Sequence, residues 1–352
     1  MSQFIQLHVL TSYPPSNLNR DDLGRPKSAT IGGVNRLRIS SQSQKRAWRT
    51  SDLFQTALAG HVGVRTKSMG ERVYKALVER GVKEKPAYEW AEAIAKCFGK
   101  LQKTGDKLEG LHIEQLAHFG PQEQAAIDEL VETLAQTQTA PTEAQLDLLR
   151  GPQAAVDIAL FGRMLAAKPR YNIEAAAQVA HAFTVHRADV DGDYYTAVDD
   201  LRPRDEDLGA GHIGETGFGA GVYYLYVCIN RDLLDENLGG DTDLRNRALA
   251  ALLQAMTQIS PTGKQNSFAS RAYASYVLAE KGEAQPRSLS LAFVQPVRAS
   301  DGNQVKAAIE ALTTKYENMD KVYGPCASSR LSMNAETGEG SLKDIIAFAQ
   351  AD

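Results

Sequence analysis

The sequence predicts an α+β protein in which an antiparallel sheet carries two insertions, one helical and one acidic. Apolar and polar residues alternate at the start of the chain and again over residues 181–185 and 222–229, as in half-buried strands. Helical periodicity replaces this alternation over residues 60–180, interrupted by Gly and Pro. An acidic, glycine-rich segment at residues 189–221 separates the two later strands.

The first elements are a strand and a helix. A half-buried strand is predicted over residues 5–9, with His8 on its exposed side. A helix rich in Gln, Lys, Arg and Ala is expected to run to about residue 58, and Ser41 or Ser43 can cap its start. Between the two we expect a polar loop over residues 14–33 and a short strand, basic on one face, over residues 37–39.

The helical insertion is expected to contain helices and no strands. Its helical segments are predicted at residues 88–103, 123–134 and 143–164. Beyond the acidic insertion we expect a helix at 244–259, strands at 273–280 and 288–294, a helix at 305–317 and a Gly/Ser-rich tail. Without the insertions the order is strand, helix, strand, strand, helix, strand, which is that of ferredoxin-like and RRM-type domains.

Composition limits the class of protein. Of the 352 residues, 43% are hydrophobic and 23% are charged. This composition is close to the globular average, so the chain can form a buried core. The 39 Lys and Arg residues are outnumbered by 43 Asp and Glu residues, which excludes a protein whose whole surface is basic. A local basic groove is still compatible with this charge balance. The three cysteines form no CxxC pair, which excludes a disulfide scaffold and a thiolate zinc site. Neither a signal peptide nor a long apolar stretch is found, so we expect a soluble, cytoplasmic protein without a membrane partner.

Residues 20–49 form a basic tract, with eight Lys or Arg against two acids. From Arg36 to Arg49 the tract contains no acid, and serines and a glutamine mark the predicted helix start. A helix N-terminus favours phosphate oxygens, and Lys45 lies one turn before Arg49 on the same helix face. The tract therefore predicts a polyanion-binding surface, and the alternative is a solvated basic face. Its basic residues are Arg20, Arg25, Lys27, Arg36, Arg38, Lys45, Arg46 and Arg49.

Signals of catalysis or of a cofactor are weak. The segment from Gly209 to Gly214 matches the GxGxxG fingerprint, but no strand precedes it and no helix follows, so no cofactor is expected. The seven histidines form no HExxH motif or ligand cluster. Asp199 and Asp200 could hold a divalent metal, yet a solvated acidic loop explains them better, and no metal site is predicted. His8 could act as a general base, although a lone strand histidine is more often merely hydrogen-bonded.

A lysine series lies in the helical insertion. Lys96, Lys100, Lys103 and Lys107 are spaced by four, three and four residues, so they would form one stripe if a single helix continued through them. Such a stripe could make weak contacts to duplex DNA or could be a solvated helix face.

Five stretches together resemble one protein family. They are residues 4–10 (FIQLHVL), 18–22 (LNRDD), 38–47 (RISSQSQKRA), 156–164 (VDIALFGRM) and 196–201 (TAVDDL). With these stretches the chain resembles the CasC family, the repeated backbone subunits of type I-E CRISPR Cascade complexes in the RAMP superfamily. The resemblance runs to about Gly240 and is weaker beyond it.

The resemblance implies a fold shaped like a right hand. An RRM-like palm would comprise residues 1–59, 181–188 and 222–352, with helical fingers at 60–180 and a β-hairpin thumb at 189–221. Several copies would wind along one CRISPR RNA (crRNA), beside other Cascade subunits. Each palm would grip the RNA backbone, and each thumb would tip out a base at regular intervals, so that the other bases can pair with target DNA. No catalysis is implied, because the family leaves DNA cutting to a separate helicase-nuclease.

The resemblance also implies a set of crRNA contacts. Arg298 belongs to this set from a weaker alignment, and position 49 is Arg where some relatives are expected to carry Lys. The full set is Arg20, Lys27, Arg38, Ser40, Ser41, Gln42, Lys45, Arg46 and Arg49 in the tract, Arg163 and Met164 after the fingers, Tyr195 and Thr196 in the thumb, and Arg298.

Two other functions stay open at this point. A backbone subunit that also cuts nucleic acid in a metal-dependent way, as relatives in type III complexes do, would use Asp199 or Asp200. A CRISPR RNA-processing endoribonuclease on a similar fold would use His8 as its base.

Overall fold

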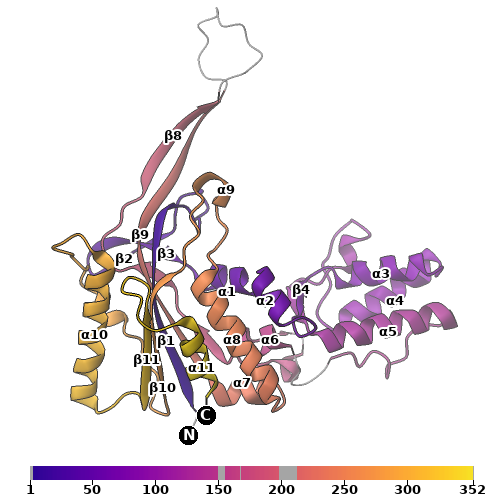
Figure 1. Ribbon diagram of the computed structural model, residues 1–352. Helices are drawn as coiled ribbons and strands as arrows, with labels where there is room; N and C mark the ends of the chain where they lie inside the picture. Colours follow the sequence, from indigo (N-terminus) through magenta and orange to yellow (C-terminus); the bar gives the residue numbers. More distant parts are fainter. Residues whose placement is uncertain (1–2, 150–154, 167, 198–211, 352) are drawn as a thin grey trace, which may run out of the picture.

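A large antiparallel sheet forms the centre of the molecule in the computed structural model, which describes residues 3–149, 155–166, 168–197 and 212–351 (Figure 1). Its strands lie in the order β11-β10-β1-β9-β7-β3-β2, and β6 and β8 also pair with β9. The strands are β1 (Phe4–Ser16), β2 (Ser28–Ile31), β3 (Val34–Ile39), β6 (Ala177–Val179), β7 (Ala182–Thr184), β8 (Asp191–Ala197), β9 (His212–Asn230), β10 (Ala274–Gly282) and β11 (Ser329–Asn334).

Helices cover both faces of this sheet. On one face Ile5, Leu7 and Val9 of β1 pack in a core with α1 (Ser41–Arg49), α2 (Asp52–Ala57), α7 (Arg231–Asn237), α8 (Thr242–Gln258) and α11 (Leu342–Gln350). On the other face Leu10 packs with the 3₁₀ helix η3 (Ser290–Phe293) and with α10 (Gln304–Tyr323). The prediction of a half-buried first strand is therefore wrong, and His8 is fully buried because its face is also covered.

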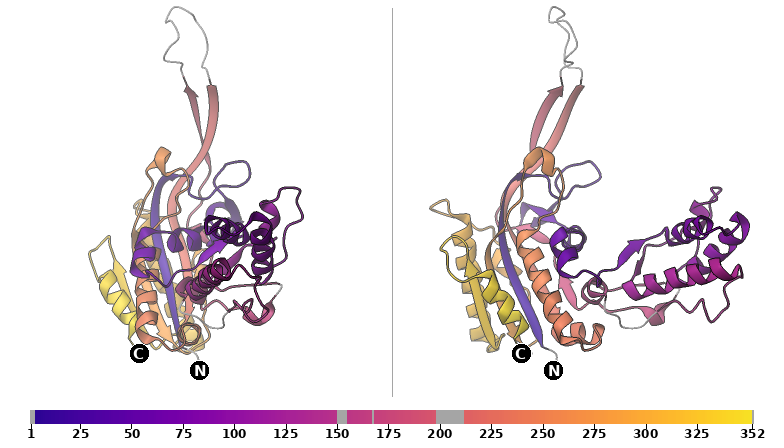
Figure 2. Two further views of the ribbon diagram at one scale, coloured as in Figure 1. Left: turned by 90° about the vertical axis from the view of Figure 1, so that its right-hand side faces the viewer. Right: turned by 45° about the vertical axis from the view of Figure 1, so that its right-hand side comes forward.

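A helical lobe with its own hydrophobic core projects from the side of the sheet (Figure 2). It contains α3 (Met69–Glu79), α4 (Glu84–Lys96), α5 (Pro121–Thr137) and, against the prediction of helices alone, the paired strands β4 (Val64–Thr66) and β5 (Ala117–Phe119). The helix predicted at 88–103 ends at Lys96. In place of the helix predicted at 143–164, the described residues contain the short helix α6 (Val156–Phe161).

Strand β9 belongs to two structures at once. Its first part pairs with β8 in a hairpin that extends beyond the sheet, and its second part pairs with β1 inside the sheet (Figure 1). Because one strand runs through both, the orientation of the hairpin is set by the sheet. Asn17 reinforces the base of the hairpin, since its Nδ2 donates to the Gly217 carbonyl at 2.9 Å.

Other local predictions are corrected by the structure. The predicted loop at 14–33 contains β2, and the segment at 288–294, predicted as a strand, forms η3. The helix predicted to run to residue 58 is two helices, because Ser51 caps a new one, and Ser40 rather than Ser41 or Ser43 caps the first. The tail contains β11 and α11, and the short helix α9 (Gln265–Phe268) precedes β10. No helix among the described residues is both long and apolar enough to cross a membrane.

Candidate nucleic-acid interface

Four segments bring basic side chains to one edge of the sheet. The Arg38 amide donates to the Lys27 carbonyl at 2.8 Å, which joins the start of β2 to the end of β3. Ile39 pairs with Ala182, so His181 lies beside Ser40, the N-cap of α1. Lys45 follows on α1. We call Lys27, Arg38, Lys45 and His181 the basic patch.

The electrostatics of the patch show that its charges lie close together. The pKa of His181 is lowered from its usual value by partial burial and by the charges of Arg38, Lys27 and Lys45. The pKa of Lys45 is lowered by partial burial and by Arg65, which follows Val64 in β4. Among the described residues, no carboxylate lies within ion-pair distance of Lys45. The patch therefore has an unneutralised positive field suited to a polyanion.

The start of α1 contributes donors to the same surface. The Ser40 hydroxyl accepts from the Ser43 amide at 3.3 Å, and this capping contact occupies a side chain that the resemblance assigns to RNA. Ser41 is also buried, whereas Gln42 and Arg46 are exposed. Near the cap, the helix N-terminus with its positive dipole end, Gln42 and Arg46 are therefore more accessible from solvent than the two serine hydroxyls.

Arg49 has a partner that lies outside the basic tract. Its Nη1 lies 3.4 Å from Oδ2 of Asp157, which is fully buried at the start of α6. The same carboxylate lies 2.7 Å from His118 Nε2 and accepts from the Gly63 amide at 2.9 Å. Burial alone would raise the pKa of Asp157, but the His118 hydrogen bond and the Arg49 charge hold it below its usual range. The basic tract, which contains no acid of its own from Arg36 to Arg49, is therefore neutralised at Arg49 by a distant acid, and Asp157 links that side chain to His118 of β5 in the helical lobe.

Arg163 and Met164 are adjacent but lie in different environments. The Arg163 side chain is 1% exposed, and its Nη1 lies 2.8 Å from both carboxylate oxygens of Glu123. Its Nη2 donates to the Tyr171 carbonyl at 3.1 Å. The structure thus places Arg163 inside the protein rather than at the RNA surface, where the resemblance put it. Met164 is 73% exposed and remains available to contact a base.

The hairpin presents its side chains on two faces. Tyr195 pairs with Gly214, and its ring crosses that glycine so closely that a Cβ atom there would lie 2.5 Å from the ring carbon Cζ. Thr196, the next residue, lies on the opposite face. Tyr194 shares the Thr196 face and is 65% exposed, against 44% for Tyr195. Sequence reasoning missed Tyr194, although its adjacency to Tyr195 on a strand signals an aromatic residue on each face.

Other predicted site residues are dispersed. Arg20 and Arg298 are exposed, and Arg25 lies 3.5 Å from Glu215 of the hairpin. Arg36 is fully buried and donates to the Thr184 and Phe293 carbonyls at 2.9 and 3.0 Å, so it adds no charge to the surface.

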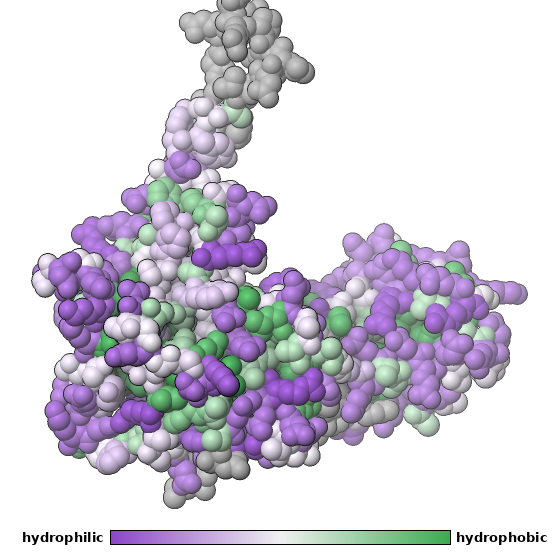
Figure 3. Space-filling view, in the orientation of Figure 1, coloured by the Kyte–Doolittle hydropathy of each residue, from purple (hydrophilic) through white to green (hydrophobic). Residues whose placement is uncertain are grey.

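The lysine series does not form one helical stripe, because α4 ends before Lys100. Lys96 pairs with Glu92 and Lys100 with Glu114, each at 2.9 Å. Figure 3 shows a mostly hydrophilic lobe surface, with apolar residues gathered where the lobe meets the sheet.

His8 belongs to a buried polar network and not to an open site. Its Nδ1 lies 2.9 Å from the Tyr224 hydroxyl and its Nε2 lies 3.1 Å from Glu280. Glu280 also accepts from Arg287 and, at 2.6 Å, from Arg330 Nε. Burial would raise the pKa of Glu280, but Arg287 and His8 hold it well below its usual range. Both ring nitrogens of His8 are therefore occupied, and its pKa is lowered mainly by burial.

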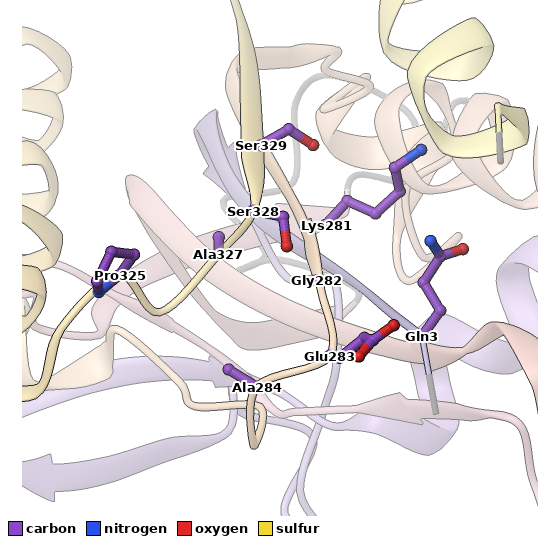
Figure 4. Close-up of a pocket in the computed structure, with 9 residues that line it drawn as sticks. All are labelled: Gln3, Lys281, Gly282, Glu283, Ala284, Pro325, Ala327, Ser328 and Ser329. Atoms are coloured by element: carbon purple, nitrogen blue, oxygen red, sulfur yellow. The ribbon is translucent and has the colours of Figure 1, made fainter. Parts of the chain in front are cut away.

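The described residues offer no metal site. No group of three His, Cys, Asp or Glu in the described ranges could hold a metal ion. Asp199 and Asp200 lie outside these ranges, as do the first three residues of the GxGxxG match, 209–211. A surface pocket of about 430 Å³ lies elsewhere, between the start of β1, the end of β10 and the segment before β11 (Figure 4). Lys281 in its wall already donates to the Phe348 and Ala351 carbonyls.

Comparisons with known proteins agree on one kind of assembly. The family described as CT1975-like protein matches residues 5–350. A chain of the solved "CRISPR RNA-guided surveillance complex, pre-nicking" is 30% identical with a TM-score of 0.84, over 98% of this chain and 100% of that one. A chain of a "CRISPR RNA-guided surveillance complex" is 26% identical with a TM-score of 0.61, over 98% and 99%. A comparison with curated proteins gave no match.

Proposed function

Because this chain belongs to the CT1975-like protein family, we propose that it is the crRNA-binding backbone subunit of a type I-E Cascade complex. Its similarity to chains of CRISPR RNA-guided surveillance complexes supports a Cascade-associated role. In the proposed role, several copies bind side by side along one spacer, in contact with other Cascade subunits. The RNA bases that they display then pair with target DNA.

The basic patch is the observation that carries this proposal. Lys27 just before β2, Arg38 of β3 and Lys45 of α1 converge beside a helix N-terminus. Such a surface binds phosphates, which carry no base information, so it suits spacers of any sequence. Exposed Met164 and Tyr194 add apolar and aromatic surface, on which any base can stack.

We also infer that the sheet is the RRM-like palm, the helical lobe the fingers and the β8–β9 hairpin the thumb. Strands β10, β1, β9 and β7 are neighbours in that order, which corresponds to the fourth, first, third and second strands of the predicted series. Both α1 and α8 pack on one face, as the two helices of that series would.

We propose a non-catalytic role. His8, the base of the endoribonuclease alternative, is fully buried with both ring nitrogens hydrogen-bonded, so an RNA at the surface cannot reach it. The metal-dependent alternative rests on Asp199 and Asp200, which lie outside the described residues, and no group of three His, Cys, Asp or Glu among the described residues could hold a metal ion. We leave Lys96 and Lys100 out of the proposed DNA contacts, because each is ion-paired within the helical lobe.

The test is RNA binding by the purified chain. We expect it to copurify with RNA and to place several copies on one spacer-length RNA, measured by sedimentation velocity. Log affinity should fall with log salt by ~0.7 per neutralised phosphate and should depend little on spacer sequence. Lys45→Ala should weaken binding, whereas Lys103→Ala, an exposed lysine of the helical lobe, is the matched control. An affinity that does not change with salt concentration, or a strong preference for one spacer sequence, would contradict the proposal.

A further inference from the structure

His181 lies in the basic patch, but it is not among the residues that the resemblance assigns to RNA. It immediately precedes β7, beside the N-cap of α1, and its side chain is exposed. Its nearest polar partner is a cation, since Arg38 Nη1 lies 2.6 Å from His181 Nδ1. A histidine that serves the fold usually pairs with a carboxylate or carbonyl, and this one pairs with an arginine at the surface. That arrangement requires a different explanation.

The Arg38 contact determines the protonation state of the ring. A guanidinium has only donors, so Nδ1 must accept the hydrogen bond and cannot carry a proton. The imidazole is therefore neutral in the RNA-free protein, with its proton on Nε2. In the RNA-free protein the patch therefore carries the positive charges of its two lysines and its arginine, and His181 could provide one more.

We propose that His181 is a phosphate ligand of the RNA site and that it takes up a proton when RNA docks, binding as the imidazolium. This inference rests on the proposed function and names a residue and a protonation step within it. In the RNA-bound state, protonated Nδ1 and Nε2 both donate, and the Arg38 guanidinium turns from Nδ1 to a phosphate oxygen.

The neighbouring charges explain why His181 takes up a proton only when RNA binds. Lys27 before β2, Arg38 at the end of β3 and Lys45 on α1 act on the ring, and all three are cations. Adding a proton to the free protein would place a fourth positive charge among them. A phosphodiester among these groups reverses the sign of the local field, which raises the pKa of His181 toward or above its ordinary value. Proton uptake and RNA binding therefore favour one another.

A proton linkage follows. Where one proton is taken up per site, affinity rises by up to about tenfold for each unit by which the pH falls. The effect is confined to the interval between the pKa values of the free and bound forms. Lysines and arginines stay charged throughout this interval, so they contribute no comparable slope.

The experiment measures affinity for a labelled, mixed-sequence single-stranded RNA between about pH 5 and pH 8 at constant ionic strength. His181→Asn retains an acceptor for Arg38 but cannot be charged, and His181→Lys is charged at every pH used. His112→Asn is the control, because His112 pairs with Glu71 at 2.7 Å in the helical lobe. Calorimetry in buffers of different ionisation enthalpy counts the protons taken up.

The wild type and His112→Asn should bind more tightly as the pH falls and should take up protons on binding. His181→Asn should lose most of this slope and uptake, and His181→Lys should bind tightly with little pH dependence. A wild type that binds RNA without proton uptake, or a His181→Asn variant with the wild-type slope, would overturn the role of His181 and leave the proposed function standing. Failure of the wild type to bind RNA at any pH would overturn the proposed function itself.

Discussion

Replacing Arg163 distinguishes a structural residue from an RNA contact. The sequence resemblance places this side chain on the RNA, but the structure places its guanidinium against Glu123, with both side chains almost completely buried. The substitution Arg163→Met removes the charge and keeps an unbranched apolar chain of similar length. It leaves the Glu123 carboxylate buried without its cation.

The expected loss follows from these contacts. Breaking a buried ion pair by removing one partner costs about 3–5 kcal/mol, because the remaining charge stays desolvated. The Tyr171 carbonyl also loses its guanidinium donor. Adding Glu123→Gln should recover much of this loss, because the amide is neutral and its oxygen can still accept from the Gly120 amide at the start of α5, as Glu123 does at 2.9 Å.

Urea unfolding followed by tryptophan fluorescence provides the measurement. Trp90 lies in the core of the helical lobe and Trp48 in the core beneath the sheet, so Trp48→Phe leaves a reporter for the lobe. The salt dependence of RNA binding is the second measurement, and Arg163→Met should not change its slope. Lys45→Ala should lower that slope by ~0.7. If Arg163→Met unfolds like the wild type and lowers the slope, Arg163 reaches RNA and our interpretation is wrong.

Three further predictions concern the patch, the bases and the core. Lys45→Glu should abolish assembly on RNA with little loss of stability. Arg49→Glu should destabilise the protein, because it places a second carboxylate beside the buried Asp157. Unfolding curves measure the stability of each variant, and sedimentation with RNA measures its assembly. Met164→Ala with Tyr194→Ala should retain RNA but flatten the periodic reactivity of its bases to chemical probes, and an unchanged pattern would refute their role. Glu280 has a lowered pKa in the folded state, so its contribution to stability is complete above about pH 4.3 and is lost as the pH falls. Glu280→Gln should therefore flatten the acid limb of stability against pH, and an unaltered limb would show that other carboxylates dominate it.

Local patterns predicted the features that depend on neighbours along the chain. Alternation marked the core of β1 and of β9, and helical periodicity marked α5 and α8, because burial of one face repeats with the period of the element. The acid-free run before Arg49 predicted a basic surface at the start of α1, where the structure gathers Lys27, Arg38 and Lys45.

The features that local patterns missed depend on residues far apart in sequence. Arg49 and Asp157 are separated by 108 positions, and Arg38 and His181 by 143. Whether a cation is free or paired is decided by which carboxylate packing brings to it, and spacing along the chain does not contain that information. Alternation also could not show that helices cover both faces of β1, which buries His8.

The sequence by itself thus determined a mixed α+β fold, the basic tract and a resemblance to subunits of CRISPR Cascade complexes. These follow from residue type and from periodicities of two and 3.6 residues, which act over a few positions. Only the tertiary structure decided which charges face solvent. It buried Arg36 and Arg163, paired Arg49 with the buried Asp157 and placed His181 among the cations. The reason is energetic, because a buried charge must find its partner wherever the fold supplies one, and an exposed charge need not.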